Sequence, residues 1–239
     1  MNPTPSDTPA RFKSVLPFLC LFVVVVLFLH PLPLFALLPH LRALLGAVLP
    51  FVAALPFALR LLSRKPEDSR LDIDTVLFGI GIGHGLLCAL TFVLLTMNLV
   101  YVSMLGAVAA LLLIVFLKQW ESIFHSIRYI QKPPDGLPRS IFVFLLLAGL
   151  LYLGSSLLPP TNYDALEYHL PVPEAWLGHH GWVSFPLNIY AWFPMNVEIL
   201  YMWGLAFGGV AATTVINLFY AVGCAAAVWC IGRRLCSAS

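Results

Sequence analysis

Charge is what this chain has least of. Only 10% of its 239 residues are charged, whereas a water-soluble domain carries about a quarter. Hydrophobic residues make up 60% of the chain, so an ordinary soluble enzyme is excluded. The formal net charge of +2 gives no basis for a nucleic-acid partner. The composition predicts a polytopic membrane protein whose main partner is the lipid bilayer.

Cysteine is scarce as well. The chain has five cysteines and no CxxC pair, and four of the five lie in apolar stretches. Such cysteines are small packing residues more often than parts of a disulfide or a metal site. The sequence predicts no certain cofactor, and a divalent metal ion held by other residues stays open as an alternative.

The apolar runs predict an all-α transmembrane bundle of about seven spans. A polar, Pro-rich cytoplasmic tail at 1–13 precedes an uncleaved signal-anchor, because no small-residue cleavage site follows. We expect four spans in residues 14–117, a basic amphipathic segment on the cytoplasmic leaflet at 118–139, and a short tail at 235–239. The seven predicted spans are 14–29, 41–62, 74–96, 99–117, 140–158, 195–209 and 211–232.

Proline and glycine mark particular places in these spans. Pro39 is expected in the turn before the second span, and Pro50 and Pro56 inside it, where membrane helices tolerate proline. His84 stands in the third span among four glycines that form two overlapping GxxxG patterns. We expect close helix packing there, with His84 as a helix-contact residue, and no phosphate-binding loop. The glycines are Gly79, Gly81, Gly83 and Gly85.

The positive charges predict the orientation, because Lys and Arg gather on cytoplasmic loops. Placing the N-terminus and the two basic loops inside puts two, four and four cations there, ten of the thirteen Lys and Arg. The loop at 159–194 then lies on the extracytoplasmic side of the plasma membrane. Arg233 and Arg234 disagree with seven full crossings. Either they lie outside, or the segment 195–209 does not cross completely.

The loop at 159–194 is where we expect the chemistry, since it is polar, acidic and rich in aromatic residues. Pro171 is expected to stop a first short helix, Pro173 to begin a second, and Gly181 to end it. Both interfacial helices would lie at the outer membrane surface. Their Trp and Tyr residues, Trp176 among them, would then lie at headgroup level.

Asp164 has two interpretations. With Glu167 three residues later, it fits a helix N-cap followed by an acid in the first turn. Alternatively, it is a general base at the lipid–water boundary, where desolvation would help it to take a proton from an acceptor hydroxyl. Glu167 and His169 are near enough in sequence to orient it, or to share a divalent ion with it.

Glu198 is the other acid of interest, because it stands one turn inside an apolar segment. A carboxylate there is expensive unless it faces a polar cavity or a partner. No cation is near it in sequence, so a cavity-lining position and an interfacial position both stay open. His179 and His180 are adjacent and point to different sides, and we expect them to face headgroups.

Residues 140–234 carry a resemblance. Four features in a fixed order resemble the N-terminal part of known membrane glycosyltransferases. They are YDALEYHL, a helix that begins with Pro and is followed by Gly, the pattern N-x-Y-x-x-FP-x-N-x-E-x-LY, and a small-residue span that ends in GRRL. These transferases are enzymes of the glycosyltransferase-C superfamily, the protein O-mannosyltransferase and aminoarabinose-transferase-like group. The chain departs from them in its four extra spans before the loop, in its end at Ser239, and in Ala165, where the family often has a second acid.

The resemblance implies a reaction. In that family an acid in the first large extracytoplasmic loop is catalytic, and the donor is a polyprenyl-phosphate sugar. It implies that Asp164 activates an acceptor hydroxyl in an inverting transfer, with Glu167 and His169 orienting it. The donor phosphate needs Arg, Lys or helix N-termini around it. Residues 140–232 lack Arg and Lys, so a missing C-terminal half or a partner chain would supply these groups. The residues expected to bind substrate are Glu198, Tyr168, Trp176, Asn188, Tyr190 and Asn196.

Two other functions stay open. A non-catalytic membrane subunit, or a truncated relative of the transferases, would use the loop to bind a partner or a lipid. A transporter or lipid flippase would need ionisable residues in several spans, and only Glu198 and His84 qualify.

Overall fold

The computed structural model describes residues 34–62, 73–117, 119–120, 123 and 139–237. The predictions for the tail at 1–13, the first span, most of 118–139 and the last two residues lie outside the described residues. The chain divides into two units, Met1–Pro39 and His40–Ser239, and the packing described below is that of the second.

Every described element is a helix, with no strand in this part of the chain. Three of the described helices are long and apolar enough to cross a membrane, which indicates a membrane protein. The all-helical, membrane class is thus confirmed for the described residues, while seven full crossings stay a prediction. The long helices are α2 (Leu34–Leu62), α3 (Ile73–Thr96) and α9 (Val210–Ser237), and the shorter ones are α4 (Val102–Val115), α6 (Arg139–Ser156) and α8 (Asn196–Gly208). The loop carries η1 (Ala165–His169), α7 (Pro171–Gly178) and η2 (Ile189–Trp192).

α2 runs without interruption through three prolines. It begins at Leu34, so Pro39 lies inside the helix, and the prediction of a turn there was wrong. Pro50 and Pro56 are buried within the same helix. Proline removes one intrahelical hydrogen bond, and membrane helices tolerate this loss because neighbouring helices and local adjustments satisfy the freed backbone groups.

One of the two GxxxG patterns packs α3 against α2, as predicted. A Cβ added at Gly83 would lie 2.6 Å from the carbonyl oxygen of Ala54, and one at Gly79 would lie 2.9 Å from a leucine side chain of α2. A Cβ added at Gly81 or Gly85 would have no atom within 4 Å. Only the face that carries Gly79 and Gly83 therefore needs the small residue.

His84 is a helix-contact residue, as expected. It is buried, its Nδ1 lies 2.7 Å from the hydroxyl of Tyr220 in α9, and its ring meets Phe51 of α2 edge-on with centroids 4.3 Å apart. The interhelical hydrogen bond satisfies a polar group that lipid could not. His84 thus ties together the three helices that are long enough to span a membrane.

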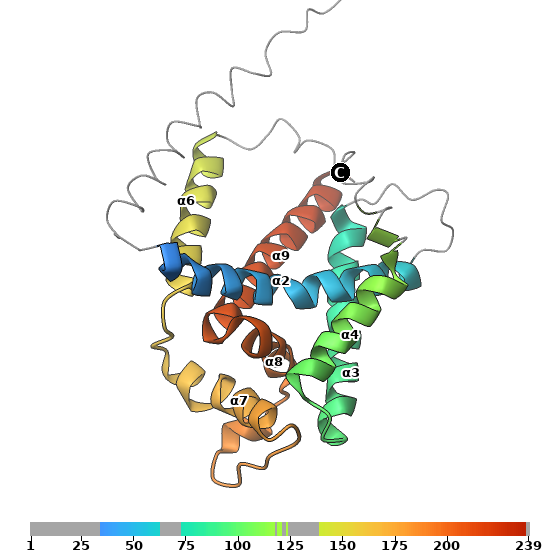
Figure 1. The fold of residues 1–239 in the computed structure, drawn as a ribbon. Helices are drawn as coiled ribbons and strands as arrows, with labels where there is room; N and C mark the ends of the chain where they lie inside the picture. The colour runs from blue at the N-terminus through green and yellow to red at the C-terminus, as the bar shows by residue number, and fades with distance from the viewer. Residues whose placement is uncertain (1–33, 63–72, 118, 121–122, 124–138, 238–239) are drawn as a thin grey trace, which may run out of the picture. The chain divides into compact units, whose positions relative to one another are not determined.

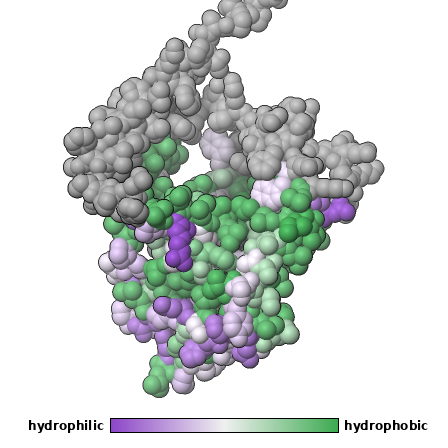
Figure 2. All heavy atoms as spheres, viewed as in Figure 1, coloured by the Kyte–Doolittle hydropathy of each residue, from purple (hydrophilic) through white to green (hydrophobic). Residues whose placement is uncertain are grey.

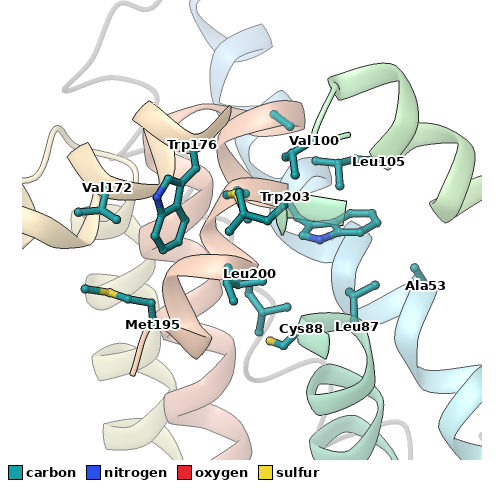
Figure 3. Close-up of a cluster of buried hydrophobic side chains, with 14 of the residues drawn as sticks. Ala53, Leu87, Cys88, Val100, Leu105, Val172, Trp176, Met195, Leu200 and Trp203 are labelled. Carbon is teal, nitrogen blue, oxygen red and sulfur yellow. The ribbon is translucent and has the colours of Figure 1, made fainter. Parts of the chain in front are cut away.

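α8 lies at the centre of the second unit, in contact with α3, α4, α7 and α9 (Figure 1). Eight of its thirteen residues are buried. The Trp203 side chain of α8 and the Trp176 side chain of α7 point into one cluster of apolar side chains (Figure 3). The indole N–H of Trp203 donates to the Thr91 hydroxyl of α3 at 3.0 Å, so this buried donor has a partner.

Polar residues gather at the end of the structure where α7 and the loop lie, whereas the surface of the helices is mainly hydrophobic (Figure 2). On α6, Phe144 and Leu151 are both largely exposed. Exposed apolar side chains of this size suit contact with lipid. The loop therefore forms the polar end of an otherwise apolar bundle.

Candidate functional site

The chain enters the loop through a short helical turn that Asn162 caps. The Asn162 side chain accepts a hydrogen bond from the backbone N–H of Asp164 at 3.1 Å, and the chain is helical from Tyr163 onward. Asp164 itself has helical backbone angles and makes no capping hydrogen bond. The interpretation of Asp164 as an N-cap was therefore wrong. The cap lies two residues upstream and leaves the Asp164 side chain exposed.

The next five residues, Ala165–His169, form one π-helical turn. The N–H of Leu170 donates to the carbonyl of Ala165 at 3.0 Å, which closes the turn. Turns of this kind are frequent at functional sites, and they change which side chains share a face. Pro171 is the first residue of α7, where its missing N–H is not needed, so the predicted start of that helix at Pro173 was two residues too late.

His169 and Glu198 form a pair at the start of α8. Nδ1 of His169 is in hydrogen-bond contact with Oε1 of Glu198. Glu198 is 4% exposed and lies in the first turn of α8, where the helix N-terminus favours a negative charge. His169 keeps 35% of its side chain exposed. The carboxylate is thus buried and not interfacial, and its partner lies 29 residues away in sequence.

The structure does not assemble Asp164, Glu167 and His169 as predicted. Within the described residues the Asp164 carboxylate accepts no hydrogen bond, and His169 turns to Glu198. The Glu167 carboxylate raises the pKa of Tyr163, first through a hydrogen bond and then through its charge. No group of three or more His, Cys, Asp or Glu in the described part is placed to hold a metal ion. The three residues therefore offer no common metal site.

Two tyrosines stack beside this pair. The rings of Tyr168 and Tyr190 have centroids 5.3 Å apart, and the Tyr168 ring lies 4.0 Å from that of His169. Desolvation, and then the charge of Asp164, raise the pKa of Tyr168. Tyr190 is exposed, so the stack presents an aromatic face to solvent.

Asn188 holds two segments of the loop together. Its Nδ2 donates to the carbonyl of Glu167 at 3.1 Å, and its Oδ1 accepts from the backbone N–H of Tyr190 at 3.1 Å. Both polar atoms thus bind backbone groups. Asn188 therefore positions η2 against η1, and its role in substrate binding stays a prediction.

Trp176 belongs to the core and not to the membrane surface. It is 0% exposed, its indole N–H donates to the carbonyl of Val183 at 3.1 Å, and its ring stacks on that of Trp182. The prediction that it lies at headgroup level was wrong, because packing against α8 buries it (Figure 3). Trp182 is the more exposed member of the stack.

α7 ends in a turn that packs against the connection between α3 and α4. His180 takes a left-handed φ of 59°, and its ring stacks on that of Tyr101 at 4.0 Å. His180 thus contacts protein rather than headgroups, whereas His179 stays exposed. Gly181 follows the helix end, and it is needed because a Cβ there would lie 1.8 Å from Oδ1 of Asn98.

A cavity of about 210 Å³ lies at the start of α8. Aromatic rings from α3, α7 and the loop line it, and Asn196 is the polar side chain among the lining residues. An apolar cavity of about 150 Å³ holds a benzene-sized molecule, so this one suits a small apolar or aromatic group. Of the predicted substrate-binding residues, Asn196 and Trp176 line the cavity, and Glu198 does not.

Sequence reasoning missed three residues of the site. Asn162 caps η1. The Tyr201 ring meets that of His169 edge-on at 6.5 Å, and its hydroxyl donates to Oδ1 of Asn217 at 2.6 Å. Two signals could have found Tyr201 and Asn217. Tyr201 follows Glu198 by three residues, which places both on one helix face, and Asn217 is a polar residue inside an apolar helix.

Comparison with known proteins gives little on identity. No family model and no solved structure matches the chain. An uncharacterized protein of Shigella flexneri is 33% identical over 86 residues, which is 35% of this chain and 43% of that protein. The chain thus spans less than half the length of the curated relative that it matches.

Proposed function

We propose that the protein is a membrane glycosyltransferase that moves a sugar from a polyprenyl-phosphate donor to an acceptor hydroxyl on the extracytoplasmic side. The pairing of His169 with Glu198 supports this proposal. The two residues come from the two segments that carry the resemblance, YDALEYHL and FP-x-N-x-E, and the fold joins them. A buried carboxylate in an apolar bundle is costly and marks a functional site by default.

In the proposed reaction Asp164 is the general base. Its exposed carboxylate accepts no hydrogen bond within the described residues, so its oxygens are open to an acceptor. The acceptor oxygen attacks the anomeric carbon, the bond from that carbon to the phosphate oxygen breaks, and the hydroxyl proton passes to Asp164. His169 and Glu198 fix η1 against α8 and thereby position the turn that carries Asp164. The exposed ring of Tyr190 offers a face on which a sugar can stack.

We infer that α8 does not cross the membrane. Its 13 residues extend for about 20 Å at ~1.5 Å per residue, less than the ~30 Å of a hydrocarbon core. Arg234 near the end of α9 forms an ion pair with Asp74 at the start of α3. The loop contacts the other end of α3, where the N–H of Val100 donates to the carbonyl of His180 at 3.0 Å.

This arrangement removes the conflict over Arg233 and Arg234. Both then lie on the cytoplasmic side, which brings the cytoplasmic Lys and Arg from ten to twelve of thirteen, in line with the positive-inside rule. A reporter that is active only in the cytoplasm, fused after Ser239, should be active. A reporter active only outside the cell would show instead that α8 crosses.

Asp164→Asn tests the general base. Because Asn162 supplies the cap, this exposed substitution should change stability by no more than about 0.5 kcal/mol. It should lower the rate of transfer by roughly 10² to 10⁴, the usual contribution of a general base. Glu174→Gln alters another exposed acid of the loop and should keep full activity. Normal transfer by Asp164→Asn would refute the assigned role.

Binding of the donor can be measured without knowing the acceptor. Purified protein is titrated with a panel of polyprenyl-phosphate sugars, and the wild type is compared with Asp164→Asn and Glu198→Gln. Saturable binding of one of them supports the donor class. Binding of none favours a non-catalytic membrane subunit, and the absence of Lys and Arg from 140 to 232 is the observation in favour of that alternative.

A further inference from the structure

We propose that Arg42 binds the phosphate of a membrane lipid. Arg42 belongs to α2 and lies within Leu37–Leu61, an apolar stretch long enough to cross a membrane. Its side chain is exposed. A cation on an apolar helix is expensive in lipid unless it reaches the headgroup layer or meets a counter-ion. Its position therefore calls for an anion.

The fold holds the arginine in place by one hydrogen bond. Its Nε donates to the carbonyl of Phe207 at 3.0 Å, in the last turn of α8. The backbones are in close contact there, since a Cβ added at Gly46 would lie 2.5 Å from Cα of Gly208. The bond occupies one of the five N–H donors of the guanidinium. The two terminal nitrogens have no partner within the described residues and can fork onto two phosphate oxygens.

No acid in the described part of the chain pairs with Arg42. The ion pairs there join His169 to Glu198 and Arg234 to Asp74. The counter-ion of Arg42 must therefore come from outside these residues. In a bilayer the abundant anion is the lipid phosphate, and its oxygens match the guanidinium fork.

A bilayer phospholipid and a polyprenyl-phosphate sugar share this phosphate chemistry. Phe207 follows Glu198 by nine residues in α8, which is about 14 Å along a helix axis. The donor phosphate is one oxygen away from the carbon that reacts, so it belongs beside the His169–Glu198 end of α8. We therefore assign the Arg42 site to a phospholipid headgroup. This assignment does not depend on the proposed transferase function.

The test titrates the purified full chain in detergent with three lipids of the same acyl chains. These are phosphatidylglycerol, phosphatidylcholine and diacylglycerol, and native mass spectrometry counts the bound lipid. Both phospholipids should bind saturably and diacylglycerol should not. Arg42→Gln should weaken phospholipid binding by about tenfold or more, because it removes charge-assisted hydrogen bonds. Arg42→Lys should be intermediate, since an ammonium lacks the fork.

Arg60→Gln is the matched control, because Arg60 is an exposed arginine near the other end of the same helix. It should leave the Arg42-dependent binding unchanged. If Arg42 only caps α8, Arg42→Gln lowers the melting temperature and leaves lipid affinity as in the wild type, which overturns the proposal. Equal binding of diacylglycerol by the wild type overturns it without any variant.

A fourth titration, with a polyprenyl phosphate, distinguishes a phospholipid from a polyprenyl-phosphate donor as the ligand of Arg42. Weaker binding than phosphatidylglycerol supports the headgroup assignment. Tighter binding that Arg42→Gln abolishes overturns it and moves the site to the donor lipid. Lipid binding in this test needs no sugar transfer, so a failure of the transferase proposal would be seen separately from a failure of this one.

Discussion

Removing the imidazole of His169 should destabilise the fold by leaving Glu198 buried without a partner. Loss of one member of a fully buried pair costs about 3–5 kcal/mol. Glu198 is 4% exposed, but the His169 side chain is 35% exposed, so water reaches one side of the pair and weakens the effect. We therefore expect His169→Ala to lower the free energy of unfolding by about 2 kcal/mol.

A double-mutant cycle isolates the pair from other effects of the substitution. Glu198→Gln removes the charge and keeps the side-chain volume, and it should cost about 1 kcal/mol. In the double variant no unpaired charge remains, so its loss of stability should be smaller than the sum of the single losses. The expected coupling is about 1 kcal/mol or more, within the range for residues in contact.

Thermal unfolding of the purified protein in detergent measures these differences. A loss of about 2 kcal/mol corresponds to roughly 4–8 °C for a chain of 150–250 residues. His179→Ala, an exposed histidine of the same loop, should change stability by no more than about 0.5 kcal/mol. Additive losses in the cycle, or an unchanged melting temperature for His169→Ala, would refute the reasoning.

Three glycine substitutions test the packing, and the effect of each is read from the melting temperature. Gly83→Ala would place a Cβ 2.6 Å from a backbone carbonyl of α2 and should cost about 1–3 kcal/mol, whereas Gly81→Ala has nothing within 4 Å and should cost nothing. An equal effect of the two would contradict the assigned packing face. Gly181→Ala would place a Cβ 1.8 Å from Oδ1 of Asn98 and should destabilise the protein. Asn98→Gly should restore most of the loss, because it removes that side chain and suits the φ of 56° at this position; no recovery would mean that the clash lies elsewhere.

Predictions that depend on composition and on helix contacts were mostly confirmed. The low charge content predicted a membrane protein, and the apolar runs predicted that it is all-helical. The GxxxG spacing predicted close packing, because a helix places residues four apart on one face. The face at Gly79 and Gly83 follows from this rule. The sequence also predicted a helix contact for His84, but not that its partner is Tyr220, 136 residues away. Regular helical periodicity is a property that a sequence carries locally.

Predictions that assumed a regular helix failed in the loop. The spacing of Asp164, Glu167 and His169 suggested one cluster, but the π turn at Ala165–His169 changes the angular position of each side chain. The cap was misassigned for a similar reason. Asn and Asp both cap helices, and sequence alone did not show that Asn162 would begin the helix before Asp164.

The sequence by itself determined that this is an apolar helical protein with one polar, acidic loop, because hydrophobicity and charge are sums over residues. Only the tertiary structure decided that His169 pairs with Glu198, that Trp176 is buried, and that Arg42 meets the end of α8. These contacts join residues far apart in the chain. They depend on how α2, α7 and α9 pack around α8, and no local spacing encodes that packing.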